Sequence, residues 1–184
     1  MKKLIPVVVI KNLEETDKIM NALKEYGVTT AEITFRTACA EDAIRLAVKN
    51  HPDMLIGAGT VINLDQAKRA IGAGAKFIVS PGLSEEVALY LKEIGVPYYP
   101  GCVTPTEIMK ALSLGIEIVK FFPANVYGGL KAMKALSAPF NQIKFIPTGG
   151  VNLDNLDEFL SWDKTYAVGG SFIVDEALKN KESK

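Results

Sequence analysis

Eight short apolar segments, each followed by a stretch with helical periodicity, constrain the fold of this chain more than any other feature of its sequence. The segments are rich in Val, Ile and Phe, as strands covered on both faces are, and the alternation of strand and helix indicates parallel pairing. They cover residues 4–10, 31–34, 55–58, 77–79, 97–99, 116–120, 144–146 and 166–168.

Eight such repeats predict an α/β protein with a TIM-type (β/α)₈ barrel, because open doubly wound sheets usually stop at five or six strands. The chain has 184 residues, whereas such barrels typically have about 250. No linker, low-complexity stretch or charge block divides it. We therefore expect one barrel domain over residues 1–184 with brief elements. Few residues follow 172–174, so the sequence predicts short terminal helices, the eighth being a stub or absent.

Several helix boundaries can also be predicted. Thr104 is a typical N-cap before Pro105, and Glu107 lies in the first turn of that helix. Asn152 or Asp154 is the expected cap of the seventh helix.

Composition excludes several classes of function. The 21 basic residues balance the 21 acidic ones, which argues against nucleic acid or a membrane surface as partner. No segment reaches the roughly 18 apolar residues of a membrane span. The apolar run at 4–10 is too short for a signal peptide and contains Pro6. Cys39 and Cys102 are isolated, without metal-site or disulfide spacing. We expect a cytoplasmic protein without a metal or other cofactor.

Lys120 is the lysine best placed for chemistry. Active sites of such barrels form at the C-terminal ends of the strands, and Lys120 ends the strand at 116–120, whereas Lys76 and Lys144 precede theirs. The aromatic residues that follow Lys120 disfavour its charged form, and a neutral amine can attack a ketone to form an imine. The alternative is a lysine that extends over the barrel rim to solvent.

The strand at 31–34 carries a row of polar residues. With a side-chain period of two, Glu32, Thr34 and Arg36 share one face, while Ile33 and Phe35 share the other. If the apolar face packs against helices, the polar row points into the barrel mouth, where a carboxylate can transfer protons and a guanidinium can bind a carboxylate. The alternative is an ion pair between Glu32 and Arg36 at the rim.

Glycine-rich turns follow four of the strands. Gly59-Thr60 and Ser80-Pro81-Gly82 allow close approach of a ligand but are weak signals. Gly149-Gly150 and Gly169-Gly170-Ser171 follow the seventh and eighth strands. Barrels frequently bind phosphate at these two positions, through backbone N–H groups and a helix N-terminus. We therefore predict a phosphate site there, the alternative being ordinary tight turns.

Together these motifs resemble one family. AEITFRT at 31–37, GAGTV at 57–61, VSPGL at 79–83, VKFFPA at 119–124, PTGG at 147–150 and GGS at 169–171 are similar to the bifunctional aldolases that act on 2-keto-3-deoxy-6-phosphogluconate (KDPG) and 4-hydroxy-2-oxoglutarate (KHG). The match runs through nearly the whole chain. The resemblance implies a metal-independent, cytoplasmic homotrimer, a lyase of carbohydrate metabolism that cleaves KDPG to pyruvate and glyceraldehyde 3-phosphate in the Entner–Doudoroff pathway, and KHG to pyruvate and glyoxylate.

The resemblance also implies residue roles. Lys120 corresponds to the Schiff-base lysine and Glu32 to the general acid/base. The remaining matches are Arg36 and Thr60 for the carboxylate of pyruvate, Gly149, Gly150, Gly170 and Ser171 for the phosphate, and Pro81, Phe122 and Thr148 for the pocket wall. The expected mechanism is class I: Lys120 forms an imine with the C2 ketone, and Glu32 removes the C4 hydroxyl proton as the C3–C4 bond breaks.

Three features depart from the family pattern. Family members carry a helix before the first strand and a further helix at the end, and Asn125 stands where an acidic residue is usual. Two rival interpretations stay open. One is another barrel enzyme, such as the aldolase for the galactonate epimer or a phosphate-binding epimerase or synthase. The other is a trimmed barrel that serves only in assembly. The sequence does not reveal substrate preference or trimer contacts.

Overall fold

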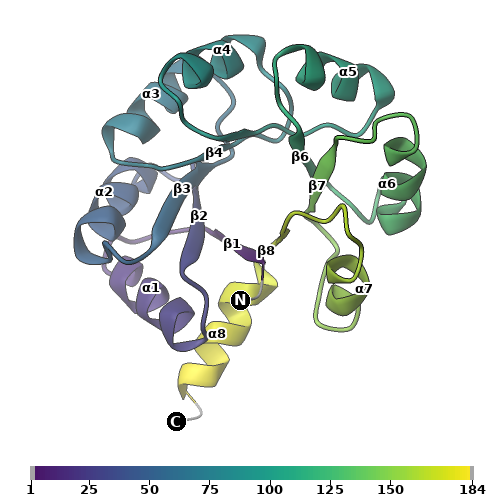
Figure 1. The fold of residues 1–184 in the computed structure, drawn as a ribbon. Helices are drawn as coiled ribbons and strands as arrows, with labels where there is room; N and C mark the ends of the chain where they lie inside the picture. Colours follow the sequence, from purple (N-terminus) through teal and green to yellow (C-terminus); the bar gives the residue numbers. More distant parts are fainter. Residues whose placement is uncertain (1–2, 183–184) are drawn as a thin grey trace.

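Eight strands alternate with eight helices in the computed structural model of this chain, which describes residues 3–182 (Figure 1). The strands are β1 (Leu4–Val8), β2 (Thr30–Thr34), β3 (Leu55–Gly59), β4 (Ile78–Val79), β5 (Tyr98–Tyr99), β6 (Ile118–Phe121), β7 (Lys144–Pro147) and β8 (Val168–Gly170). The helices are α1 (Glu15–Glu25), α2 (Ala40–Asn50), α3 (Leu64–Gly72), α4 (Glu85–Glu93), α5 (Pro105–Ser113), α6 (Gly129–Ser137), α7 (Leu156–Leu160) and α8 (Phe172–Glu182).

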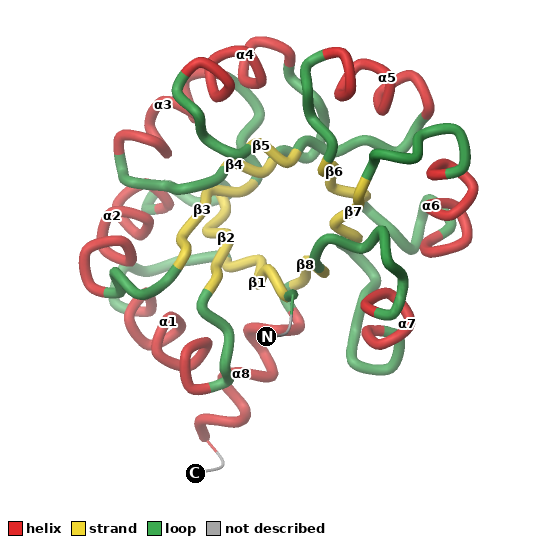
Figure 2. Tube along the Cα trace, in the orientation of Figure 1, coloured by secondary structure: helices red, strands yellow, loops and turns green. Residues whose placement is uncertain are grey.

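The strands form a ring of parallel pairings. Six of them make one sheet in the order β5-β4-β3-β2-β1-β8, and β6 pairs with β7. Single-residue bridges join Gly101 to Lys120 next to β5 and Thr148 to Gly169 next to β8. The ring of strands is surrounded by the helices (Figure 2). This arrangement confirms the predicted TIM-barrel fold, with strand boundaries that differ from the expected ones by one or two residues at most ends.

Two apolar clusters stabilise the barrel. The larger one includes Ile33 and Val119 together with side chains from all eight helices, so it fills the layer between strands and helices. The smaller one contains Ile5, Phe77 and Ile146 and occupies the barrel interior. Side chains on a strand alternate between these two layers. Because Ile33 belongs to the outer layer, Glu32 on its other side faces inward.

The expectation of short terminal helices is wrong. The final helix α8 has 11 residues, as many as α1 and α2. The error arose because residues 172–174, which look like the end of a strand, already belong to the helix. The chain turns at Ser171 immediately after β8. Before β1, residue 3 is the only one that the structure describes, and it is not helical.

Helix caps agree with the sequence at one site and differ at another. Thr104 caps α5 as predicted, in a reciprocal capping box with Glu107. Neither Asn152 nor Asp154 caps α7, whose N-cap is Asn155. The Asn152 side chain instead accepts hydrogen bonds from the backbone of Asp154 and Asn155. Over residues 3–182, no helix has both the length and the apolar character needed to cross a bilayer.

Candidate active site

Lys120 and Glu32 meet inside the barrel. Lys120 lies on β6 and Glu32 on β2, on opposite sides of the ring (Figure 2). The Lys120 Nζ is 3.5 Å from the Glu32 Oε1, and the two side chains are 4% and 3% exposed. Lys120 therefore does not extend over the rim to solvent, as one interpretation of the sequence allowed. Its amine also lies 5.2 Å from the centre of the Phe122 ring.

Burial dominates the electrostatics of the Glu32 carboxyl. Removal from water raises the pKa of Glu32, because the charged form loses its hydration. The positive charges of Lys120 and, to a smaller extent, Arg36 oppose this effect. A carboxyl with a raised pKa keeps its proton to a higher pH than a glutamate in water does. That property suits a group that must accept a proton and later return it.

Arg36 and Thr60 form a second polar pair at the ends of β2 and β3. The Arg36 Nε donates a hydrogen bond of 3.0 Å to the Thr60 hydroxyl. Thr60 has a left-handed φ of 56°, which is unusual for a β-branched residue and costs about 1–3 kcal/mol. The guanidinium thus binds Thr60 rather than forming the rim ion pair with Glu32 that the sequence left open.

Gly59 provides the space that the Glu32 carboxylate occupies. The two residues lie on neighbouring strands, with Glu32 paired to Gly57 and Thr34 paired to Gly59. A Cβ atom on Gly59 would overlap the Glu32 carboxylate. Glycine at this position is therefore needed so that Glu32 can turn inward toward Lys120.

The predicted phosphate loops lie next to each other at the same end of the barrel. Gly149 and Gly150 both have positive φ values, 89° and 77°. Outside helices and strands, no backbone hydrogen bond within residues 3–182 is donated by the N–H of Gly149, Gly150 or Ser171. The Ser171 carbonyl accepts from Val174 and Asp175, so Ser171 precedes the first turn of α8. Free N–H groups and a helix N-terminus together suit an anion.

Thr148 and Pro81, two of the residues expected to line the pocket, are closely packed against neighbouring strand ends. The Thr148 backbone N–H donates to the Phe121 carbonyl, which ties β7 to β6. A Cβ on Gly169 would overlap the Thr148 hydroxyl, and one on Gly101 would overlap the Pro81 carbonyl. Gly101 in turn bridges to Lys120. Close packing of this kind fixes the positions of the strand ends.

Asn155 is a residue that the sequence reasoning missed. Its side-chain Nδ2 donates to the Gly150 carbonyl at 3.1 Å, and its Oδ1 accepts from the backbone N–H of Asn152 at 2.9 Å. Asn155 therefore links the double-glycine turn to the loop before α7 through these two hydrogen bonds. The only available signal was an asparagine five residues after Gly150, which is too common a pattern to interpret without a structure.

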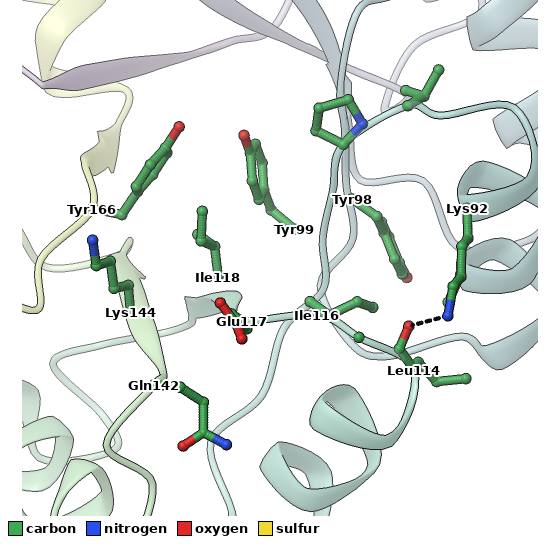
Figure 3. Close-up of a pocket in the computed structure, with 14 residues that line it drawn as sticks. Lys92, Tyr98, Tyr99, Leu114, Ile116, Glu117, Ile118, Gln142, Lys144 and Tyr166 are labelled. Carbon is green, nitrogen blue, oxygen red and sulfur yellow. Dashed lines mark hydrogen bonds between the residues drawn. The ribbon is translucent and has the colours of Figure 1, made fainter.

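The opposite end of the barrel is hollow. A cavity of about 500 Å³ opens at the N-terminal ends of the strands, where Tyr99, Tyr166 and Lys144 line it (Figure 3). A second cavity of about 380 Å³ shares the two tyrosines. Neither contains Lys120 or Glu32. Among residues 3–182, His, Cys, Asp and Glu side chains nowhere gather in threes that could hold a metal ion.

The barrel has eight strands, and a buried lysine and carboxyl lie in contact at the strand ends. Barrel enzymes have their active sites at this position, so the fold and the site together define a barrel enzyme. The sequence profile of the family described as KDPG and KHG aldolase matches residues 1–184. Two curated relatives are the 2-dehydro-3-deoxy-phosphogluconate aldolase of Treponema pallidum and the KHG/KDPG aldolase of Escherichia coli. The first is 42% identical, covering 94% of this chain and 82% of the relative, and the second is 41% identical, covering 92% and 80%. The chain belongs to the KDPG and KHG aldolase family and is a lyase.

Solved structures agree with this assignment. The KDPG aldolase of Legionella pneumophila, captured with pyruvate as a covalent carbinolamine, superposes with a TM-score of 0.92 at 42% identity, covering 98% of this chain and 88% of that one. The Zymomonas mobilis enzyme with 3-phosphoglycerate gives 0.90 at 33% identity, covering 100% and 92%. The interpretation as a barrel with only an assembly role is thereby disfavoured.

Proposed function

We propose that this protein cleaves KDPG to pyruvate and glyceraldehyde 3-phosphate, and KHG to pyruvate and glyoxylate, by class I chemistry. The observation that carries the proposal is the buried contact between Lys120 and Glu32 at the strand ends. A lysine and a carboxyl excluded from water are the two groups that imine formation and proton transfer require. The names of the relatives supply the substrates.

Lys120 is proposed to be the nucleophile. Its neutral amine attacks the C2 ketone to give a carbinolamine, and loss of water gives a protonated imine. The imine then accepts the electron pair of the C3–C4 bond when that bond breaks. The buried position of Lys120 at the end of β6, in contact with the Glu32 carboxyl, supports this role.

Glu32 is proposed to transfer the protons. It removes the proton of the C4 hydroxyl, so that the aldehyde leaves and an enamine of pyruvate remains on Lys120. The carboxyl then returns the proton to C3, and water hydrolyses the imine to release pyruvate. The raised pKa of Glu32 supports both halves of this cycle.

We assign the carboxylate end and the phosphate end of the substrate to two separate groups of residues. Arg36 and Thr60 bind the C1 carboxylate, which a guanidinium can hold through parallel hydrogen bonds. Gly149, Gly150, Gly170 and Ser171 bind the phosphate through backbone N–H groups at the start of α8. Pro81, Phe122 and Thr148 form the wall between them.

Trapping of the imine tests the proposal. Incubation with pyruvate and borohydride should add one pyruvyl group to the chain, and peptide mapping should locate it on Lys120. Lys120→Ala should abolish both the label and KDPG cleavage, while Lys76→Ala, just before β4 at the other end of the barrel, should keep both. A label on another lysine would overturn the assignment. Relative turnover of KDPG, its galactonate epimer and KHG then defines substrate preference.

We further propose that residues 1–184 act as one aldolase domain, in a cytoplasmic homotrimer. Two free cysteines, Cys39 and Cys102, fit a reducing compartment. The family resemblance supports the trimer. Sedimentation equilibrium should give a mass three times the 19.9 kDa of the chain.

A further inference from the structure

The loops that follow β6, β7 and β8 contain no charged side chain where they border the proposed phosphate site. Residues 121–130, 147–153 and 168–174 are all uncharged. An anion held there is therefore neutralised by backbone dipoles and by neutral donors. The identity of these donors determines how well the site distinguishes a phosphorylated substrate from an unphosphorylated one.

Asn125 is packed directly against the double-glycine turn. Its backbone N–H donates to the Gly149 carbonyl at 3.2 Å. Its side chain occupies the place that a Cβ on Gly150 would take, with the Nδ2 atom 2.8 Å from that position. The loop that follows Phe121 at the end of β6 and the turn after β7 are thus in direct contact.

The Asn125 amide is free to bind a ligand. It makes no hydrogen bond to any residue within 3–182, and the residue is exposed. Of the neighbouring polar side chains, Ser171 also has no hydrogen bond within residues 3–182, whereas the other three take part in hydrogen bonds. Thr148 is buried and donates to the Ile146 carbonyl, Asn152 accepts from two backbone N–H groups, and Asn155 holds Gly150.

We propose that Asn125 is a specificity-determining residue that donates its side-chain N–H to the phosphate of the substrate. This inference rests on the proposed function, because it assumes that the phosphate binds at Gly149 and Gly150. The Asn125 amide supplies N–H donors to the dianion. The KDPG phosphate is four carbons from the ketone, so Asn125 acts on binding of that end and not on imine formation.

The test uses the reverse reaction, in which pyruvate condenses with an aldehyde. The kcat/KM values for D-glyceraldehyde 3-phosphate and for D-glyceraldehyde are compared in the wild-type protein and in Asn125→Ala. Loss of one hydrogen bond to a charged group should lower the value for the phosphorylated aldehyde about tenfold in the variant. The value for D-glyceraldehyde should stay within about twofold.

Two controls separate this inference from the proposed function. Asn141→Ala removes an asparagine amide before β7, at the other end of the barrel, and should leave the kcat/KM values for both aldehydes unaffected. Exchange of the pyruvate methyl protons in D₂O reports the imine and enamine alone and should persist in Asn125→Ala. An unchanged preference in Asn125→Ala, or equal losses for both aldehydes, overturns the role of Asn125. Absence of exchange and of condensation in the wild-type protein overturns the proposed function instead.

Discussion

Lys120 and Glu32 are 88 residues apart in sequence and 3.5 Å apart in space, and they contact each other through the interior of the barrel. Each is held by a different neighbour: Lys120 pairs with Ile146 on β7, and Glu32 fits beside Gly59 on β3. The contact therefore depends on closure of the strands into a ring, because β2 and β6 are not neighbouring strands. It also separates two functions, amine attack and proton transfer, that can be tested one at a time.

Glu32→Gln should preserve imine formation and abolish efficient cleavage. The amide has nearly the same shape but cannot take the C4 hydroxyl proton, so kcat should fall about 10²–10⁴-fold. Borohydride trapping of pyruvate on Lys120 should continue, because attack by the amine does not need that proton acceptor. Glu117→Gln, at the opposite end of the barrel, is the matched control and should keep full activity. Loss of trapping in Glu32→Gln would mean that Glu32 acts earlier than proposed.

Gly59→Ala should displace the Glu32 carboxylate and destabilise the fold. The new Cβ overlaps that carboxylate, and forced repacking in a dense interior costs about 1–3 kcal/mol of unfolding free energy. Gly72→Ala is the control, because nothing lies within 4 Å of its added Cβ.

Shortening the Glu32 side chain by one methylene group should relieve its overlap with the Cβ of Ala at position 59. In the Gly59→Ala background, Glu32→Asp should recover part of the lost stability, whereas in the wild-type background it should be destabilising. Urea unfolding of the four proteins measures this coupling. Additive effects would show that Gly59 and Glu32 do not compete for space.

The fold could be predicted from the sequence because its signals are local. Strand periodicity placed Glu32 and Arg36 on one face, and the Thr104 capping box was readable as a short motif. The eighth helix was missed because its first turn, 172–174, has the composition of a strand. The Glu32–Lys120 contact and the fit of Gly59 depend on pairing between distant strands. No local pattern encodes that pairing, and the same holds for the bond from Asn155 to Gly150.

Arg36→Lys should weaken binding of pyruvate. Lysine keeps the charge but loses the planar group that can hold a carboxylate and bind Thr60 at once. Loss of one such hydrogen bond raises KM for pyruvate in the condensation about tenfold, with a smaller effect on kcat. Arg45→Lys, on the outer face of α2, should change neither constant. A fall in kcat alone would assign Arg36 to chemistry rather than to binding.

The raised pKa of Glu32 should make stability depend on pH in a specific direction. Between the ordinary pKa of glutamate, about 4.3, and the raised value, the folded protein keeps a proton that the unfolded chain has lost. The unfolding free energy therefore falls as pH rises through this window, by at most about 1.4 kcal/mol per pH unit, and levels off above the raised pKa. Glu32→Gln lacks this titration. The wild-type value minus the variant value, from urea unfolding at several pH values, should decrease across the window, and a constant or rising difference would mean that the pairing with Lys120 outweighs burial.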